Sequence, residues 1–322
     1  MRGLVLTFTF LTLQLFSSVV AAQETLKPTE VTGLPIDELG AQRTTRPIQV
    51  VGEDELQTTE RSLSDSLNTL PGIQSRLNGS PTISIRGSQS SARTLVFTDG
   101  APLNFADGVG FNPIFIAYEN LDHIVLLRGP ASSLFGHDAV SGALEFDSEK
   151  LVSSKYFGSY GSFGSSQVFA GTPFSIGEAQ AQVTAYEAYS DGTFPYTTQS
   201  GFSGSRSLDN QETQRATVLA SDTKSESLQW KSYNLVARQI GSTPGALDFP
   251  DPSSFNNWAD LNYLGGNIKL DENLKFGSRS TFKYLHQDYP SYGPTSDTQS
   301  FRQGFSLVHQ IGNFSIELFD EI

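Results

Sequence analysis

From about residue 151 onward, apolar and polar side chains alternate with a period of two. The clearest stretch sets Phe276, Phe282 and Tyr284 opposite Lys275, Arg279, Thr281 and Lys283, and Phe314, Ile316 and Leu318 continue the pattern. One apolar and one charged face is typical of strands that lie between lipid and a wet lumen. A soluble antiparallel sandwich alternates in the same way, so the period alone leaves both architectures open.

The lengths of the connections favour the membrane barrel. The pattern predicts nine strands, near residues 152–161, 165–175, 179–190, 212–222, 226–240, 261–271, 274–288, 298–310 and 313–322. Links after the second, fourth, sixth and eighth strands are short, whereas those after the third, fifth and seventh are long and rich in Gly, Pro, Asp and Tyr. Short turns that alternate with long loops are typical of outer-membrane barrels. The short first outer link, 161–165, is a mild exception.

Residues 47–148 have a different texture, with short helical and strand patterns that predict a compact α+β domain. A helix is predicted from Ser62, with an apolar face of Leu63, Leu67 and Leu70 and a stop at Pro71-Gly72. Further strands are predicted near 48–51, 83–85, 94–98, 124–127 and 143–146, and a short helix from Pro130 to Gly136. Asp99-Gly100 is expected to be a turn without a chemical role.

The first residues predict export. Arg2 precedes a mostly apolar run from Leu4 to Phe16, and small residues at 20–22 offer a cleavage site. We therefore expect a signal peptide at 1–22 and a polar, flexible segment at 23–46. The remaining chain divides into a domain at 47–148 and a strand-rich region at 151–322.

Composition narrows the function classes. The chain has 322 residues, no Cys and a formal net charge of −13, which excludes disulfides and thiolate sites and argues against a nucleic-acid partner. No run of about 18 apolar residues follows the leader, so no transmembrane helix is expected. We expect no cofactor.

Enzyme chemistry has little support in the sequence. The four histidines are scattered without metal-ligand spacing. His137-Asp138 and Ser141 lie near each other in sequence, but such adjacency does not assemble a triad. The glycine-rich run 158–164 lacks the Lys and following helix of a phosphate loop. We therefore expect a protein that is not an enzyme.

Four sequence blocks, in order, resemble the plug domain of TonB-dependent outer-membrane receptors. They are Ser62–Gln74, Ile83–Gly87, Leu95–Asn104 and Ile124–Gly136, followed by a last plug-like strand at 139–146. The resemblance covers about residues 47–148 closely and the remaining strands more loosely. It implies an α+β plug followed by an antiparallel transmembrane β-barrel, located in the bacterial outer membrane.

The resemblance also implies a function. Receptors of this family bind a scarce ligand outside the cell, and the TonB complex pulls on an N-terminal segment so that the plug rearranges. Thr29, Glu30, Val31, Thr32 and Gly33 resemble this TonB box, with residues 24–26 as runner-up. An extended segment binds a partner by strand addition. The implied partners are TonB, outer-membrane lipid and a small ligand, and the receptor is expected to be a monomer.

The resemblance suggests two kinds of site residue. Arg86 and Arg128 match the two plug arginines that pair with barrel carboxylates, and simple solvated surface is the alternative. A ferric siderophore is the first expectation for the ligand, and cobalamin is the second because 242–250 resembles cobalamin receptors. Weak Ca²⁺ candidates lie on the predicted outer side at Asp191, Asp209, Asp248 and Asp251, with Asp260 nearby, although acidic loops are usually just soluble surface.

The barrel is expected to be incomplete in this chain. About nine strands form an odd number, whereas bacterial single-chain barrels have an even one. The sequence therefore predicts an open sheet, and we interpret the chain as a fragment or a premature stop. The alternative function is a secreted or surface adhesin, or a structural β-protein, without transport.

Overall fold

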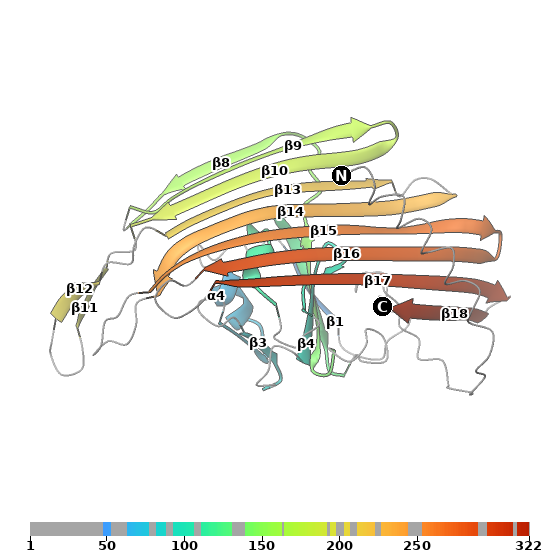
Figure 1. The fold of residues 1–322 in the computed structure, drawn as a ribbon, viewed down its shortest axis with the longest axis horizontal. Helices are drawn as coiled ribbons and strands as arrows, with labels where there is room; N and C mark the ends of the chain where they lie inside the picture. The colour runs from blue at the N-terminus through green and yellow to red at the C-terminus, as the bar shows by residue number, and fades with distance from the viewer. Residues whose placement is uncertain are drawn as a thin grey trace.

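The computed structural model contains two main sheets of different size and two small hairpins, and the largest sheet arches over the N-terminal unit (Figure 1). Within the parts of the chain it describes, no helix has the length and apolar character needed to cross a membrane. The described residues are 48–52, 63–76, 82–87, 93–105, 111–130, 139–162, 164–191, 194–197, 203–206, 211–222, 227–243, 253–288, 295–311 and 314–321. The predicted signal peptide, the TonB box candidate and the helix expected at 130–136 lie largely or wholly outside these residues.

The N-terminal unit, which comprises the described residues between 48 and 148, is built on a five-stranded mixed sheet with the order β1-β6-β7-β4-β5. Only β4 and β7 run parallel, and the other neighbours are antiparallel. The central strands carry buried apolar runs at Leu95–Val96, Ile124–Leu127 and Ala143–Leu144. The bounds are β1 Ile48–Gly52, β4 Thr94–Thr98, β5 Ala101–Pro102, β6 Leu121–Arg128 and β7 Gly142–Ser148.

One α-helix and a hairpin pack beside this sheet. Helix α4 spans Leu63–Asn68, and its predicted apolar face is confirmed, because Leu63, Leu67 and Leu70 are all buried. The hairpin pairs β2 (Ile73–Arg76) with β3 (Thr82–Ile85). Two 3₁₀ helices, η3 (Pro113–Phe115) and η4 (Tyr118–Asn120), lead into β6.

The larger sheet has nine antiparallel strands in the order β18-β17-β16-β15-β14-β13-β10-β9-β8. It is open, because β8 and β18 form its two edges and are not paired with each other. Their bounds are β8 Lys155–Tyr160, β9 Ser166–Ile176, β10 Ala179–Ser190, β13 Gln211–Asp222, β14 Leu228–Thr243, β15 Ser253–Asp271, β16 Leu274–Asp288, β17 Ser296–Ile311 and β18 Phe314–Glu321.

The nine predicted strands are thus confirmed, with two corrections. Strand β15 begins at Ser253 rather than near 261, so Asp260 lies within a strand and not in an outer loop. The long connection after β10 contains a further hairpin, β11 (Phe194–Thr197) with β12 (Ser203–Arg206), which the pattern did not predict. Both misses concern polar, Ser- and Asn-rich stretches in which the apolar alternation is weak.

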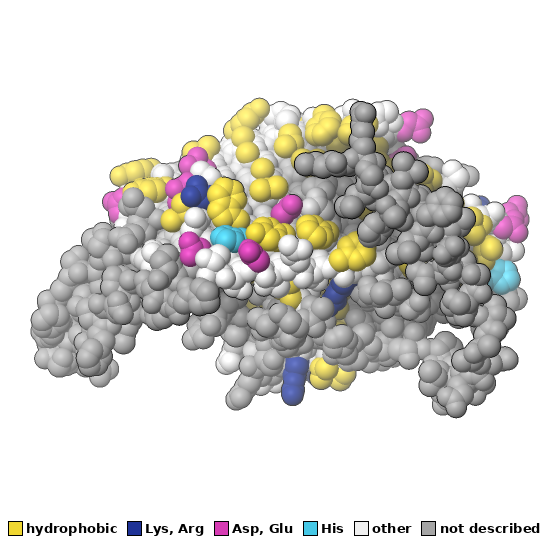
Figure 2. Space-filling view, in the orientation of Figure 1, with side chains coloured by type: hydrophobic (Ala, Val, Ile, Leu, Met, Phe, Trp, Pro, Cys, Tyr) yellow, Lys and Arg dark blue, Asp and Glu magenta, His cyan; other side chains and the backbone are white. Residues whose placement is uncertain are grey.

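The two faces of the large sheet have opposite surroundings. Tyr233, Leu235 and Leu261 point to the concave side and are buried in one hydrophobic core with side chains of the N-terminal unit. We call this side the inward face. Exposed apolar side chains lie on the other, outward face, including Val236, Phe282, Phe301 and Phe305. Figure 2 shows hydrophobic side chains gathered over the upper strands of the sheet. This division matches the predicted lipid-facing and inward-facing sides.

Candidate functional site: the contact between the N-terminal unit and the sheet

A buried ion pair joins the large sheet to the N-terminal unit. Arg215 lies on the inward face of β13, and its Nη1 is 2.9 Å from Oε2 of Glu119 in η4. The two side chains are only 5% and 2% exposed. Arg215 also donates from Nε to the carbonyl oxygen of Ile114, 3.3 Å away. A guanidinium suits this place because its planar fork reaches a carboxylate and a carbonyl at the same time.

Aromatic rings complete the surroundings of this pair. The guanidinium carbon of Arg215 lies 4.8 Å from the ring centre of Tyr118 and 5.8 Å from that of Tyr186 on β10. The electron-rich ring faces attract the cation and exclude water. Burial raises the pKa of Glu119, and the neighbouring Arg215 charge only partly opposes this effect. The Arg215 cation therefore offsets only part of the cost of burying the Glu119 carboxylate.

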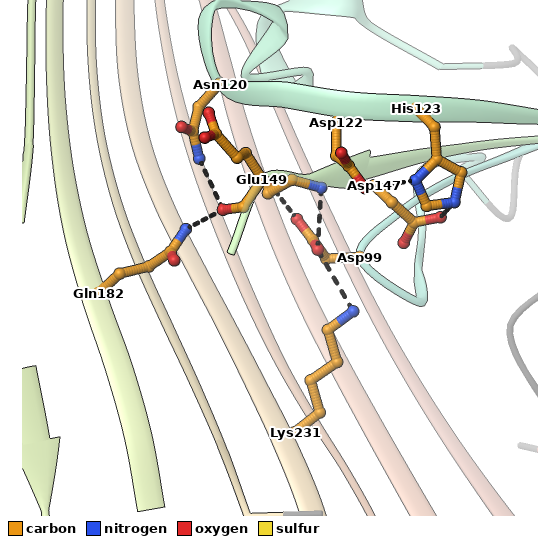
Figure 3. A network of polar contacts seen from close by, with 9 residues as sticks. Asp99, Asn120, Asp122, His123, Asp147, Glu149, Gln182 and Lys231 are labelled. Carbon is orange, nitrogen blue, oxygen red and sulfur yellow. Dashed lines mark hydrogen bonds and ion pairs between the residues drawn. The ribbon is translucent and has the colours of Figure 1, made fainter. Parts of the chain in front are cut away.

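A second ion pair lies one strand further along the sheet. Nζ of Lys231 on β14 is 3.2 Å from Oδ1 of Asp99, whose side chain is 2% exposed (Figure 3). Asp99 sits in the turn after β4 with a positive φ of 50°. Its carboxylate also accepts hydrogen bonds from the backbone N–H and the hydroxyl of Ser148, at 3.3 and 2.6 Å. The predicted turn is confirmed, and its Asp99 side chain also pairs with Lys231.

A third cation reaches the N-terminal unit from β16. Lys283 is fully buried, and its Nζ donates to the carbonyl oxygens of Pro102, at 3.1 Å, and of Asn104. The ammonium group also lies 4.8 Å from the ring centre of Phe105. Asn104 is itself held in place, because its side chain accepts from the N–H of Val96 and donates to the carbonyl oxygen of Thr94. Lys283 therefore binds a rigid loop.

The link between the two parts of the chain is anchored as well. Gln182 on β10 donates to the carbonyl oxygen of Glu149 at 2.8 Å and accepts from the N–H of Leu151 at 2.9 Å. Asn120 donates to the same Glu149 carbonyl at 3.4 Å (Figure 3). Nearby, within the N-terminal unit, His123 lies 2.8 Å from Asp122 and 3.4 Å from Asp147. The chain thus enters the large sheet from a fixed point.

The two arginines singled out in the sequence lie close to each other. Arg128 ends β6, and its Nη2 donates to Oε1 of Gln49 on β1. Arg86 follows β3 with a φ of +55°, and its Nη1 lies near Gly129, the residue after Arg128. Their pairing with barrel carboxylates stays a prediction.

Three of the calcium candidates, Asp209, Asp248 and Asp251, lie outside the described residues. The TonB box candidate Thr29–Gly33 lies outside them as well. Asp191 is described, at the end of β10, with its carboxylate against Gly164. Among the described residues, no three His, Asp or Glu side chains are grouped to hold a metal ion.

Arg215, Lys231 and Lys283 were not among the residues expected to form a site. The period-two pattern indicates that Arg215 and Lys283 face inward, since each shares the parity of the polar face of its strand. Lys231 shares its parity with the apolar Tyr233 and Leu235, so the pattern does not single it out. The pattern does not indicate which groups of the N-terminal unit these residues meet, because those contacts join residues far apart in the sequence. The three contacts have the opposite polarity to the expected pairing, with the cation on the sheet.

Comparisons with known proteins agree with this arrangement. Residues 41–143 match the family described as TonB-dependent Receptor Plug Domain. The vitamin B12 transporter BtuB of Vibrio vulnificus is 30% identical over 112 residues, which are 33% of this chain and 18% of that protein. The iron-regulated outer membrane virulence protein of Vibrio cholerae is also 30% identical over 112 residues, covering 32% and 17%.

Solved structures share the fold over most of the chain. The ferric enterobactin receptor PfeA of Pseudomonas aeruginosa superposes with a TM-score of 0.63 and 13% identity, covering 86% of this chain and 49% of that one. For the ferric yersiniabactin uptake receptor FyuA of Yersinia pestis the TM-score is 0.62, with 16% identity and coverage of 86% and 47%. The chain thus spans about half the length of these structures.

The N-terminal unit is a plug domain, and the large sheet corresponds to barrel strands of the same receptors. The match of residues 41–143, the curated relatives and the shared fold all agree with the four sequence blocks. Residues 41–143 are therefore a TonB-dependent receptor plug domain, and the chain shares its fold with ferric siderophore receptors.

Proposed function

We propose that this chain is part of a receptor that takes up a scarce ligand across the outer membrane, with energy delivered through TonB. The observation that carries the proposal is the docking of the plug against the inward face of the sheet. Buried contacts from Arg215, Lys231 and Lys283 hold it there. A plug fixed in this way blocks the lumen, and it has to be moved before a ligand can pass.

The need for outside work follows from the energies of these contacts. Undocking the plug separates the Arg215–Glu119 pair together with the contacts of Lys231 and Lys283, and it opens the hydrophobic core that the plug shares with the sheet. The outer membrane holds no nucleotide or ion gradient that could supply such work. A pulling partner in the periplasm would supply it. We propose Thr29–Gly33 as the segment that TonB binds by strand addition.

For the ligand we propose a ferric siderophore, with cobalamin as the second candidate. Two of the similar solved proteins are described as receptors for ferric enterobactin and ferric yersiniabactin. One similar curated protein is described as a vitamin B12 transporter, and this similarity supports cobalamin as the second candidate. Both ligands are too large and too scarce to rely on diffusion through a general pore.

The test is uptake by the intact receptor. Cells that lack their own receptors would express the full-length gene product, and uptake of ⁵⁵Fe-siderophores and of labelled cyanocobalamin would be measured with and without tonB. We expect accumulation of one ligand only in the tonB-positive strain. Recovery of the protein solely in the culture medium would instead support the adhesin or structural alternative. Equal uptake in both strains would contradict the coupling to TonB.

A further inference from the structure

The inward face of the large sheet carries several basic side chains. Residues that pair with one another across neighbouring strands form a row that crosses the strands, and the basic side chains lie in successive rows. Lys231 and Arg279 belong to one row, because both pair with Gly265, which lies between them and has no side chain. Arg302 pairs with Thr281, which is one inward-facing position further along β16. Directly opposite residues of an antiparallel pair share one face, and Thr281 is buried on the inward face.

The next two rows continue the series. Lys283 occupies the row after Thr281. Arg215 belongs to the row after that, since it pairs with Ala237, which pairs with Ala259 and through it with Leu285. Each of four consecutive inward-facing rows therefore holds at least one basic side chain. Successive rows are two residues apart, so the series extends over about 20 Å along the strands. We call these five residues the basic ladder.

Acidic side chains are distributed in the opposite way. Glu187, Glu212 and Asp260 lie on the outward face, opposite Gln214, Ile240 and Val236 respectively. Asp297 also belongs to the outward face, because it pairs with His286. His286 lies on the same face of β16 as the exposed Phe282. Among described side chains between the turns of β8–β17, none on the inward face is an Asp or Glu.

The plug presents oxygen atoms to three members of the basic ladder. Glu119 meets Arg215, Asp99 meets Lys231, and the backbone carbonyls of Pro102 and Asn104 meet Lys283. These acceptors keep the buried cations paired while the plug is docked. When the plug is drawn away, the same cations face an aqueous lumen without them, and an anion is the species that would best replace the lost partners.

We propose that the basic ladder lines the path of an anionic ligand, and that the plug oxygens occupy it until the plug is displaced. This inference rests on the proposed uptake function and adds a ligand class to it. The chemistry selects a chelate of a trivalent metal whose oxygen ligands carry more negative charge than the metal neutralises, as tris-catecholates do. Neutral complexes, such as tris-hydroxamates, would gain nothing from the ladder.

The test is ion selectivity, which needs neither TonB nor the natural ligand. The full-length receptor would be placed in planar bilayers at a urea concentration that reversibly releases the plug, and reversal potentials would be read in a KCl gradient. Arg279→Gln with Arg302→Gln removes two ladder charges while Arg215, Lys231 and Lys283 keep their contacts with the plug. Arg238→Gln is the matched control, because Arg238 stacks on Trp258 on the outward face.

We expect the ratio of chloride to potassium permeability to fall at least roughly threefold in the double glutamine variant. It should stay at the wild-type value in Arg238→Gln, and Arg279→Lys with Arg302→Lys should restore it. An unchanged ratio in the double glutamine variant, or an equal fall in Arg238→Gln, would overturn the ladder. Loss of TonB-dependent uptake with the selectivity shift intact would refute the uptake function instead, so the two failures are distinguishable.

Discussion

Arg215 on strand β13 and Glu119 in the plug form an ion pair at 2.9 Å in which both side chains are almost completely buried. The pair joins residues that are far apart in the sequence and belong to different parts of the molecule. Bulk water cannot solvate either charge if its partner is lost. Removing one partner therefore destabilises plug docking more than removing both.

The first prediction concerns this pair. Arg215→Met should destabilise plug docking by about 3–5 kcal/mol, because it leaves Glu119 buried beside Tyr118 without its cation. Hydrogen exchange of residues 111–128 in detergent is the measurement. The double variant Arg215→Met with Glu119→Leu should recover much of the protection. Arg238→Met, on the outward face, is the control, and equal loss of protection there would rule out the assigned role.

A second prediction concerns pH. Burial raises the pKa of Glu119 above the ordinary value of 4.5, so the docked plug holds this proton more tightly than the undocked plug does. The stabilising contribution is then complete below pH 4.5 and disappears as the pH rises through the raised value. Hydrogen exchange should therefore show a difference in plug protection between wild type and Glu119→Gln that changes as the pH rises from 4.5 through the raised pKa of Glu119. A constant difference would show that Glu119 does not titrate there.

A third prediction concerns the two plug arginines. Arg128→Ala removes the hydrogen bond to Gln49 and should loosen the edge strand β1. If barrel carboxylates pair with both arginines in the complete receptor, Arg86→Ala and Arg128→Ala should each lower protection across the plug by losing a charge-assisted bond. Unchanged protection in both variants would favour the solvated-surface alternative.

A fourth prediction concerns coupling. Val31→Pro should abolish uptake by the intact receptor while ligand binding at the cell surface stays unchanged, because Pro removes a main-chain donor from the proposed TonB box. Val31→Thr, which keeps the donor and the β-branched shape, is the matched control. Normal uptake by the proline variant would place the box elsewhere, with residues 24–26 as the next segment to examine.

The sequence predicted the membrane strands well where local pattern determines them. Strand β16 runs from Leu274 to Asp288, as predicted, because strict alternation is bounded by a short turn on one side and a Pro- and Tyr-rich loop on the other. The start of β15 was placed too late, since Asn256, Asn257 and Asp260 interrupt the apolar pattern. Polar residues are tolerated there because backbone pairing with β14 and β16 fixes the strand.

The local sequence pattern does not predict the contacts that dock the plug against the sheet. Parity indicates that Lys283 faces inward, whereas Lys231 lies among apolar residues of the same parity. The partners of the two lysines, Asp99 and Asn104, belong to a turn and a loop of the plug. Those loops gain their positions from the mixed sheet and from side-chain bonds such as that of Asn104 to Val96. Only the three-dimensional arrangement brings the lysines and these acceptors together, so no local pattern favours these acceptors over others.

The parallel pairing of β4 with β7 has a consequence for the order in which the molecule is made. Neighbours in the large sheet are hairpins or close in sequence, whereas β7 lies between β6 and β4 and pairs with the distant Thr94–Thr98 of β4. Pairing of distant strands first costs the entropy of closing a long loop, before any stabilising contact forms. This cost slows folding. The plug is synthesised before the barrel strands, yet its central sheet has to wait until Gly142–Ser148 has been made, and strands that begin only a few residues later are then ready to pair as well.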